Sequence, residues 1–328
     1  MKTVCVYHSI DLDGWMSAAI VKYWFEKQLI ITNSSIDSIT DKIDFIGYNY
    51  GQPIPDLSEY DKVIMCDISF SIEEMENLRQ HLQDNFIWID HHISAIKAAD
   101  ERTNNYYDGI RDTKFAACEL TWKYFFPDEP MPEIVRLLGR YDCFGHKGTD
   151  EELKVLEFQY GARQVITNYE DAYNWLQDGI LHSLTTINRI HTQGEAIYQY
   201  LCTEAKQVYK NGFEIGLGQS SVKLVDLATI PDTEPETLKN AVGTFLPYKF
   251  ICINKERFNP INFGIDYHKN GYDGCACFHF DGTHWCFSLY NDNGKVDCSV
   301  IAQQFGGGGH KGAAGFRLNN EDFNKLIF

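Results

Sequence analysis

The chain has 328 residues, which is long enough for two domains that each bury a core. Hydrophobic residues make up 44% and charged residues 23%, the balance of an ordinary soluble protein, and no apolar run is long enough to cross a bilayer. The net charge of −17 argues against a protein that coats long nucleic acid, because such binding depends on lysine and arginine displacing counterions. A short nucleotide substrate remains compatible with this charge. The first residues (MKTVCVYHSIDLDG) carry charges and no cleavage pattern, so we expect no signal peptide, no membrane partner and a cytoplasmic location.

The first 90 residues alternate short apolar runs with segments of helical spacing. The run VCVY ends at His8 and precedes the segment MSAAIVKYWFEK, the run VIMC ends at Asp67 and precedes SIEEMENLRQHL, and the run FIWI ends at Asp90. Alternating strands and helices imply right-handed crossovers and a parallel sheet. We therefore predict an α/β domain with a doubly wound, mostly parallel sheet.

The rest of the chain changes character once. Residues 113–209 are mainly helical in pattern, whereas strand-like pieces follow Asn211 and Gly212. These pieces are SVKLVDLA, KFICINKE, INFGIDYH and a hairpin in GCACFHFDGTHWCFSLY. We predict a first domain over 1–205 and a smaller α+β domain over 213–328.

The ten cysteines are scattered and form no CxxC pair. Several lie in apolar, strand-like runs, namely Cys5, Cys66, Cys252, Cys275 and Cys277. Secreted disulfide frameworks are shorter and regularly spaced, so we interpret these residues as reduced, buried thiols. Cys275 and Cys277 share one side of a strand, which leaves a soft-metal site as the alternative.

Acidic and imidazole side chains follow successive strands of the predicted sheet. In an open parallel sheet the carboxyl ends of the strands meet at one edge, where ligands bind. Asp142, at the end of an amphipathic helix, is a further candidate for the same edge. The full set is His8, Asp11, Asp13, Asp67, Asp90, His91, His92 and Asp142.

So many carboxylates cannot stay crowded without compensating positive charge. Oxygen ligands mixed with imidazole, and no thiolate near the site, favour Mn²⁺, with Mg²⁺ as the alternative and Zn²⁺ less fitting. The number of ligands is enough for two ions about 3.5–4 Å apart that lower the pKa of a bridging water and neutralise phosphoryl oxygens. Taken singly, each residue has an ordinary explanation: Asp67, for example, could cap the following helix. Their recurrence at three strand ends favours the metal site.

The segment FGGGGHKGAAGF (305–316) is a second signal. Four successive glycines are not favoured by packing, since glycine loses backbone entropy and buries little surface. They indicate backbone amides brought close to an anion, with His310 and Lys311 as further donors. A flexible turn is the alternative. The formal GxGxxG precedes no obvious dinucleotide-binding βαβ unit, and the segment lacks the GK[ST] of a P-loop, so we discount both nucleotide motifs.

These ordered motifs resemble the DHH phosphoesterase superfamily. The resemblance rests on HSIDLDG (8–14), Asp67 after VIMC, IDHH (89–92) and Asp142. The glycine-rich tail is similar to the signature of the DHH-associated type 1 domain. That domain occurs in nanoRNases, oligoribonucleases, RecJ-like exonucleases and dinucleotide phosphodiesterases. The resemblance spans nearly the whole chain, with a catalytic domain over 1–205 and a substrate-binding domain over 213–328.

The resemblance also implies roles for the candidate residues. His8 and Asp11 would bind one Mn²⁺, Asp13, His91 and Asp142 would bind the other, and Asp67 would bridge them. His92 would face the substrate phosphate and protonate or stabilise the leaving group, with Asp90 orienting the neighbouring histidine. The glycine loop would reach across a cleft to hold the nucleotide. Its substrate-binding residues would be Gly307, Gly308, Gly309, His310 and Lys311.

Two departures qualify this resemblance. His8 and Asp11 are three residues apart instead of the usual four, which leaves open which of Asp11 and Asp13 binds which ion. Where many members carry an arginine after Ser-Leu, this chain has Tyr290, which could stack on a base. The substitutes for that phosphate anchor would be Lys311, Arg317 or Arg257.

The expected activity is hydrolysis of short oligonucleotides or dinucleotides by a phosphodiesterase of the nanoRNase or oligoribonuclease kind. The alternatives are a phosphomonoesterase acting on adenosine bisphosphate or a related nucleotide and a catalytically silent nucleotide-binding regulator. A pyrophosphatase or polyphosphatase fits less well, because its relatives carry a different second domain. The chain could act as a homodimer.

Overall fold

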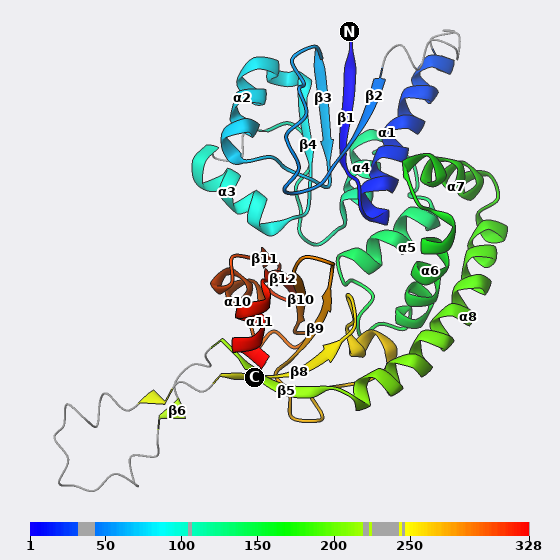
Figure 1. Cartoon of the computed structure of the whole chain (residues 1–328). Coiled ribbons are helices and arrows are strands. Elements are labelled where there is room, and N and C mark those ends of the chain that lie inside the picture. The colour runs from blue at the N-terminus through cyan, green and yellow to red at the C-terminus, as the bar shows by residue number, and fades with distance from the viewer. Residues whose placement is uncertain (32–42, 104–106, 219–222, 225–242, 245–246, 328) are drawn as a thin grey trace, which may run out of the picture. The chain divides into compact units, whose positions relative to one another are not determined.

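The computed structural model describes residues 1–31, 43–103, 107–218, 223–224, 243–244 and 247–327 (Figure 1). The chain divides into two compact units, Met1–Gln199 and Tyr200–Phe328. The division falls inside the long helix α8 (Ser183–Lys210). The ends that we predict for the two folding domains, 1–205 and 213–328, remain predictions.

A parallel sheet forms the centre of the N-terminal unit. Its strands are β1 (Thr3–His8), β2 (Ile43–Tyr48), β3 (Lys62–Cys66) and β4 (Phe86–Ile89), in the order β2-β1-β3-β4. All three pairings are parallel, which confirms the predicted α/β class. The connections run in opposite directions from β1, so the topological switch point lies between β1 and β3.

Helices cover both faces of this sheet (Figure 1). They are α1 (Leu12–Ile31) and α4 (Ala117–Phe125) on one face and α2 (Ile72–Leu82) and α3 (Ile93–Thr103) on the other. Val4 and Val6 of β1 belong to the same buried cluster as Met75 of α2, whereas Cys5 belongs to the same buried cluster as Ala18 of α1. Because successive side chains of a strand point to opposite faces, both faces of β1 are buried and the strand is apolar throughout.

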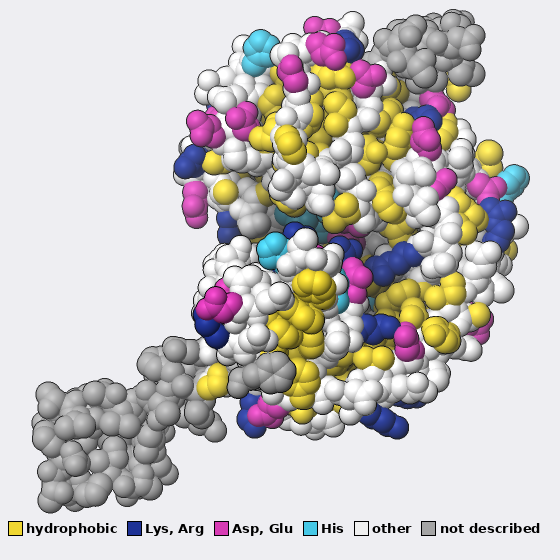
Figure 2. Space-filling model, in the orientation of Figure 1, with side chains coloured by type: hydrophobic (Ala, Val, Ile, Leu, Met, Phe, Trp, Pro, Cys, Tyr) yellow, Lys and Arg dark blue, Asp and Glu magenta, His cyan; other side chains and the backbone are white. Residues whose placement is uncertain are grey.

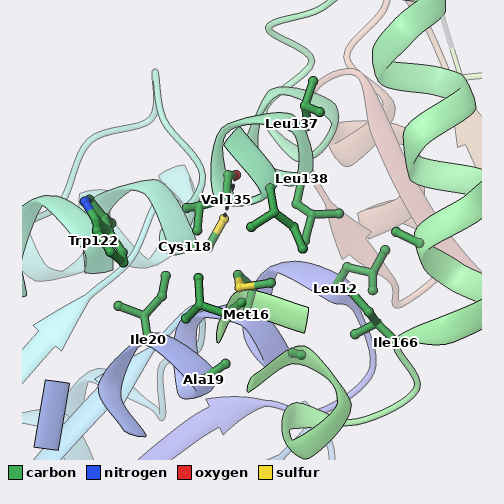
Figure 3. Packing of buried hydrophobic residues seen from close by; sticks show 14 of the residues in the cluster. Leu12, Met16, Ala19, Ile20, Cys118, Trp122, Val135, Leu137, Leu138 and Ile166 are labelled. Atoms are coloured by element: carbon green, nitrogen blue, oxygen red, sulfur yellow. Dashed lines mark hydrogen bonds between the residues drawn. The ribbon is translucent and has the colours of Figure 1, made fainter. Parts of the chain in front are cut away.

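A helical layer continues the N-terminal unit. Its helices are α5 (Glu133–Asp142), α6 (Glu152–Val165), α7 (Tyr169–Leu181) and α8. In α5, Val135, Leu137 and Leu138 point into a core that also contains Leu12 and Met16 of α1 (Figure 3). Burying each such side chain stabilises the fold by roughly 1.5–3 kcal/mol. This packing fixes the end of α5, where Asp142 lies.

The C-terminal unit has a mixed sheet in the order β11-β12-β10-β9-β8-β5. Its strands are β5 (Phe213–Leu217), β8 (Tyr248–Asn254), β9 (Gly274–Phe280), β10 (Trp285–Tyr290), β11 (Gly308–Gly309) and β12 (Ala313–Leu318). A separate pair consists of β6 (Lys223–Leu224) and β7 (Gly243–Thr244). The helices α10 (Cys298–Gln304) and α11 (Asn320–Ile327) contribute Ile301 and Phe323 to the core. The predicted α+β class and the hairpin of β9 and β10 are confirmed.

Two strand predictions differ from the structure. The segment INFGIDYH begins with a 3-10 helix, Pro260–Phe263, which Asn259 caps and Gly264 ends at a φ of 76°. Proline and a left-handed glycine interrupt an extended ladder, so the prediction of a strand here was wrong. Of the segment SVKLVDLA, Lys223–Leu224 is a strand and the remainder lies outside the described residues.

The cysteines are free thiols, and the five assigned to apolar runs are buried, as predicted. Among the residues that the structure describes, no helix combines the length and apolar character needed to cross a membrane. Acidic side chains mark the outer side of α2 and α3 in the view of Figure 2, in keeping with the net charge of −17.

Candidate metal centre

Side chains from three strand ends meet at the carboxyl edge of the N-terminal sheet, beside its switch point. Asp67, directly after β3, lies at the centre of this group. Its Oδ2 is 3.4 Å from Nδ1 of His8 at the end of β1, and its Oδ1 is 3.3 Å from Nε2 of His91 after β4. Each oxygen of the Asp67 carboxylate therefore lies next to an imidazole nitrogen, one from His8 and the other from His91.

The first side consists of His8, Asp11 and Asp67. Nδ1 of His8 is 2.8 Å from Oδ2 of Asp11. Asp11 lies just before α1, and its other oxygen accepts a hydrogen bond of 3.0 Å from the backbone N–H of Gly14. A Cβ at position 14 would lie 2.0 Å from the carbonyl oxygen of His8, so the turn requires glycine there.

The second side consists of Asp13, His91 and Asp142. Nε2 of His91 is 3.2 Å from Oδ2 of Asp142 and 3.7 Å from Oδ2 of Asp13. The backbone N–H groups of Ala117 and Cys118, at the start of α4, donate to the two oxygens of Asp13 over 2.9 and 2.7 Å. A helix N-terminus stabilises a carboxylate in this position, and no local sequence pattern indicates this contact. Asp11 and Asp13 thus lie on the sides that the resemblance implies, while their binding of ions remains a prediction.

A partly buried ion pair joins α5, the helix that ends at Asp142, to α4. Arg140, two residues earlier on α5, donates from Nη2 to Oε2 of Glu119 on α4 over 2.6 Å. The same Glu119 oxygen accepts the backbone N–H of Ala116 over 3.1 Å. Removing either partner of a buried pair leaves an uncompensated charge, so this contact locks α5 onto α4.

His92 has a different environment from His91. Its Nδ1 is 2.7 Å from Oδ1 of Asp90, a fully buried carboxylate. Asp90 also accepts the backbone N–H groups of His91 and His92 and the indole N–H of Trp88. Asp90 therefore lies within hydrogen-bonding distance of the ring of His92, and a role in orienting this ring remains a prediction.

The neighbouring carboxylates raise the pKa of both His8 and His91. Burial lowers the pKa of His8, but hydrogen bonds to Asp11 and Asp67 outweigh burial and raise the pKa to about 11. Burial likewise lowers the pKa of His91, and its hydrogen bond to Asp67 and its proximity to Asp142 raise the pKa to about 11.

The aspartates differ from one another. Burial raises the pKa of Asp13, and repulsion from Asp67 and Asp142 raises it further. Burial also raises the pKa of Asp142, to about 6, although His91 opposes that shift. Burial would raise the pKa of Asp67 too, but hydrogen bonds from His8 and His91 hold it well below its usual range. The pKa values of Asp13 and Asp142 are therefore raised by the crowding, and further positive charge at the site would lower them.

The donor set fits divalent cations. Nε2 of His8 is buried and has no hydrogen-bond partner among the described residues, which is costly for a polar atom. The ligand atoms of each side lie within 4.8 Å of one another and consist of carboxylate oxygens and imidazole nitrogens alone. Carboxylate oxygens combined with imidazole nitrogens bind manganese and magnesium in preference to soft metals.

The backbone at Asp67 is also unusual. Its φ is 61°, a left-handed value that a non-glycine residue rarely adopts, and its N–H donates to the carbonyl of Ile89 over 3.0 Å. Such strain costs of order 1–3 kcal/mol and is concentrated at functional sites. The N-cap of α2 is Ser71, whose Oγ accepts the N–H of Glu74. The ordinary explanation of Asp67 as a helix cap is therefore wrong.

Sequence reasoning missed Tyr50, which follows β2. Its ring centroid is 6.1 Å from that of His8 and 6.3 Å from that of His92, and half of the residue is exposed. No motif marks this tyrosine. The strand before it was not predicted either, because Asp44 and Gly47 interrupt its apolar pattern.

The glycine segment lies in the C-terminal unit. A Cβ at Gly307 would lie 2.1 Å from the carbonyl oxygen of Gly315, and one at Gly309 would lie 2.6 Å from Cα of Ala314. Both glycines allow the chain to pack against β12, so the argument that packing cannot favour them was wrong. Gly308 pairs with Gly315, and the N–H of His310 donates to Ala313 over 2.7 Å.

A surface pocket of about 540 Å³ adjoins this segment. It is lined by Gly306 and Gly307 together with Arg257, Ser288 and Arg317, among others. Two of the three basic residues considered as phosphate anchors thus line one pocket. Lys311 is exposed on the loop beyond it, and binding of substrate by Gly307–Gly309, His310 and Lys311 remains a prediction.

Known proteins resemble this chain in sequence and fold. Residues 3–138 match the model of the DHH family, N-terminal domain. An uncharacterized protein, R106 of Acanthamoeba polyphaga mimivirus, is 24% identical over 96% of this chain and 67% of its own length. A DHH domain described as a member of the s1p family of ribosomal proteins has a TM-score of 0.56 at 14% identity, covering 99% of this chain and 84% of its own, and shows the shared fold.

Two further solved structures are more distant. The pGpG-specific phosphodiesterase PggH of Vibrio cholerae has a TM-score of 0.47 at 13% identity, covering 99% of this chain and 96% of its own. The exonuclease RecJ bound to manganese has a TM-score of 0.46 at 14% identity, covering 99% and 88%.

Proposed function

We propose that this chain is a metal-dependent phosphoester hydrolase that cleaves phosphodiesters in short oligonucleotides or dinucleotides, because residues 3–138 match the model of the DHH family, N-terminal domain. We further propose that two Mn²⁺ ions are its cofactor. The proposal combines the family match with the arrangement of the strand-end residues.

His8 and Asp11 would hold one ion, Asp13, His91 and Asp142 would hold the other, and Asp67 would be shared between them. Bound ions of this kind activate water and neutralise charge on phosphoryl oxygens. The observation that carries the proposal is the position of Asp67, with one oxygen 3.4 Å from His8 and the other 3.3 Å from His91. A carboxylate placed in this way fits a bridging ligand.

His92 would act on the leaving group. With Nδ1 held by Asp90, the other ring nitrogen is the one that would donate a proton to the departing oxygen. Burial lowers the pKa of His92, but the hydrogen bond to Asp90 outweighs burial and raises the pKa, which favours the protonated ring that a general acid requires. Asp90 is thus a positioning residue for His92.

The C-terminal unit would bind a nucleotide. Its pocket brings the guanidinium groups of Arg257 and Arg317 to the walls of one cavity beside Gly307. Planar guanidinium groups recognise phosphate by paired hydrogen bonds, and they would take the place of the arginine that is absent at Tyr290.

A panel of substrates tests the proposal. The purified chain with Mn²⁺ is compared on a dinucleotide, a single strand of about twenty nucleotides and adenosine bisphosphate, with released mononucleotide and inorganic phosphate measured separately. We expect the dinucleotide to have the highest kcat/KM and to release mononucleotide. Faster cleavage of the long strand would reject the preference for short substrates.

The same panel distinguishes the other functions. Inorganic phosphate released from the bisphosphate, with the dinucleotide untouched, would identify a phosphomonoesterase instead. Nucleotide binding in a calorimetric titration with Mn²⁺, without turnover of any substrate, would identify a regulator.

A further inference from the structure

Large apolar side chains are exposed around the candidate metal centre. Ile10 lies between His8 and Asp11 in the chain and is 45% exposed, Ile93 follows His92 and is 40% exposed, and Phe144 is 45% exposed. Tyr50 is 50% exposed. A single exposed apolar residue needs no explanation, but several around one acidic site indicate a ligand with an apolar part.

Phe144 lies two residues after Asp142 and has a φ of 57°. A bulky residue rarely adopts a left-handed backbone, so the strain at this position adds to that at Asp67. The backbone around the site is thus strained at a second position, next to an exposed aromatic ring.

Tyr50 contacts two histidines of the candidate site, His8 and His92. Its ring lies edge-on to His92, with an interplanar angle of 79° and centroids 6.3 Å apart, and it is tilted by 58° against His8. The tyrosine hydroxyl is 3.5 Å from Oγ of Ser69, which anchors the far end of the ring. The ring therefore touches both histidines while half of the residue faces solvent.

The turn after β2 holds this ring in place. The N–H of Gln52 donates to the carbonyl of Asn49 over 3.1 Å, and Gly51 adopts a φ of 87°. The hydroxyl of Tyr48 donates to the carbonyl of Gln52 over 3.3 Å. An aromatic surface that is already ordered binds a ligand without a further loss of entropy.

We propose that Tyr50 is a stacking platform for a nucleobase beside the metal centre, so that the site selects nucleoside phosphates over phosphates that lack a base. The inference rests on the proposed function for the position of the scissile phosphate. His92 would protonate the leaving oxygen, and Tyr50, next to His92, would then lie on the side of the leaving nucleoside. Stacking of a base on an aromatic side chain tolerates any base, because every base has a π-face.

Equilibrium binding tests this role independently of turnover. Adenosine monophosphate and ribose 5-phosphate, which share the phosphate and the sugar, are titrated in the presence of Mn²⁺ into the full chain and into Tyr50→Ala and Tyr50→Phe. Tyr200→Ala is the matched control, since Tyr200 is 67% exposed and lies in α8. Circular dichroism checks that each variant is folded.

We expect the wild type to bind the nucleotide more tightly than the sugar phosphate. Tyr50→Ala should weaken nucleotide binding by about tenfold or more and leave ribose 5-phosphate within about twofold, whereas Tyr50→Phe, which keeps the ring, should resemble the wild type. The Tyr200→Ala control should change neither affinity.

Three outcomes overturn the inference. Equal binding of the two ligands by the wild type would show that no base is recognised. An equal loss of both ligands in Tyr50→Ala would show that the ring only supports the histidines. A loss in Tyr50→Phe as large as in Tyr50→Ala would assign the effect to the hydroxyl. If a dinucleotide is not hydrolysed but adenosine monophosphate binding depends on Tyr50, the proposed function fails and this inference stands.

Discussion

The strand-end site of the N-terminal unit and the glycine segment of the C-terminal unit are both conspicuous in the sequence, yet the fold uses them differently. At the strand ends, residues up to 59 positions apart in the chain, from His8 to Asp67, come within 3.4 Å, and Nε2 of His8 has no hydrogen-bond partner in the part of the chain that the structure describes. In the glycine segment, Gly307 and Gly309 are explained by contact with β12. The crowded charges at the strand ends are not explained by packing, whereas the glycines without side chains are.

Clustered charges and clustered glycines therefore differ in how strongly they indicate a bound ligand. Burying like charges costs free energy unless a cation or a proton compensates it, so such a cluster points to a ligand. Glycine is chosen both where a ligand approaches the backbone and where another strand does. The predictions below test each side of this contrast.

Asp67→Asn is the change with the largest expected effect. It removes the negative charge from the centre of the group while keeping the shape of the side chain. We expect kcat to fall by at least about a thousandfold and the number of bound Mn²⁺ ions to decrease, because a bridging ligand holds both. Asp84→Asn, at an exposed carboxylate after α2, is the control. Full activity in Asp67→Asn would remove the basis of the proposed metal site.

His92→Ala separates proton transfer from metal binding. The ring is held by Asp90 over 2.7 Å, so its loss should lower kcat by about 10²-fold or more, the range for a lost general acid. Calorimetric titration with Mn²⁺ should give the same number of ions as the wild type. If the variant loses an ion together with its activity, His92 is a ligand and the assigned role is wrong.

The sequence was sufficient to predict that the candidate ligands at strand ends lie together, because parallel topology alone brings those ends together. It was also sufficient to predict that Asp142 lies near this edge of the sheet, because the amphipathic pattern of α5 places Asp142 at the C-terminal end of that helix. It could not provide the hydrogen bonds from Ala117 and Cys118 to Asp13, which join residues about a hundred positions apart and have no local pattern.

The errors have physical causes as well. β2 was missed because Gly47 and Asp44 break its apolar run at the edge of the sheet. INFGIDYH was assigned to a strand although Pro260 precedes it and Gly264 lies within it, and both residues oppose extended pairing. Strand predictions therefore failed where turn residues or an exposed edge outweighed hydrophobicity.

Gly307→Ala and Gly308→Ala sharpen the contrast from the C-terminal side. A methyl at 307 would collide with the carbonyl of Gly315 at 2.1 Å, whereas a methyl at 308 would meet no atom within 4 Å among the described residues beyond its two chain neighbours. We expect the first to lower the free energy of unfolding by roughly 1–3 kcal/mol and the second to leave it nearly unchanged, measured by urea denaturation. If Gly308→Ala weakens nucleotide binding without loss of stability, the segment binds substrate in addition to packing.

Glu133→Gln tests what holds α5 in place. This helix carries Asp142, the proposed ligand that does not follow a strand. Glu133 begins α5, the helix that ends at Asp142, and its carboxylate pairs with Arg136 at 2.7 Å and with Lys154 at 2.8 Å. The hydrogen bond from Arg136 is the main reason that the pKa of Glu133 falls to about 2. We expect the variant to lose about 1 kcal/mol or less at pH 7, since the pair is partly exposed.

The pH dependence of that loss follows from the lowered pKa. A carboxylate whose pKa is lower in the folded protein contributes its full stability above the unfolded value of about 4.5 and loses it as the pH falls toward 2. The difference between the wild type and Glu133→Gln should therefore shrink between pH 5 and about pH 3 in urea denaturation. Glu321→Gln, in an exposed pair with Lys325, should show no comparable difference at either pH. A loss that stays constant over this range would mean that packing of α5, and not the ion pair, fixes the helix that carries Asp142.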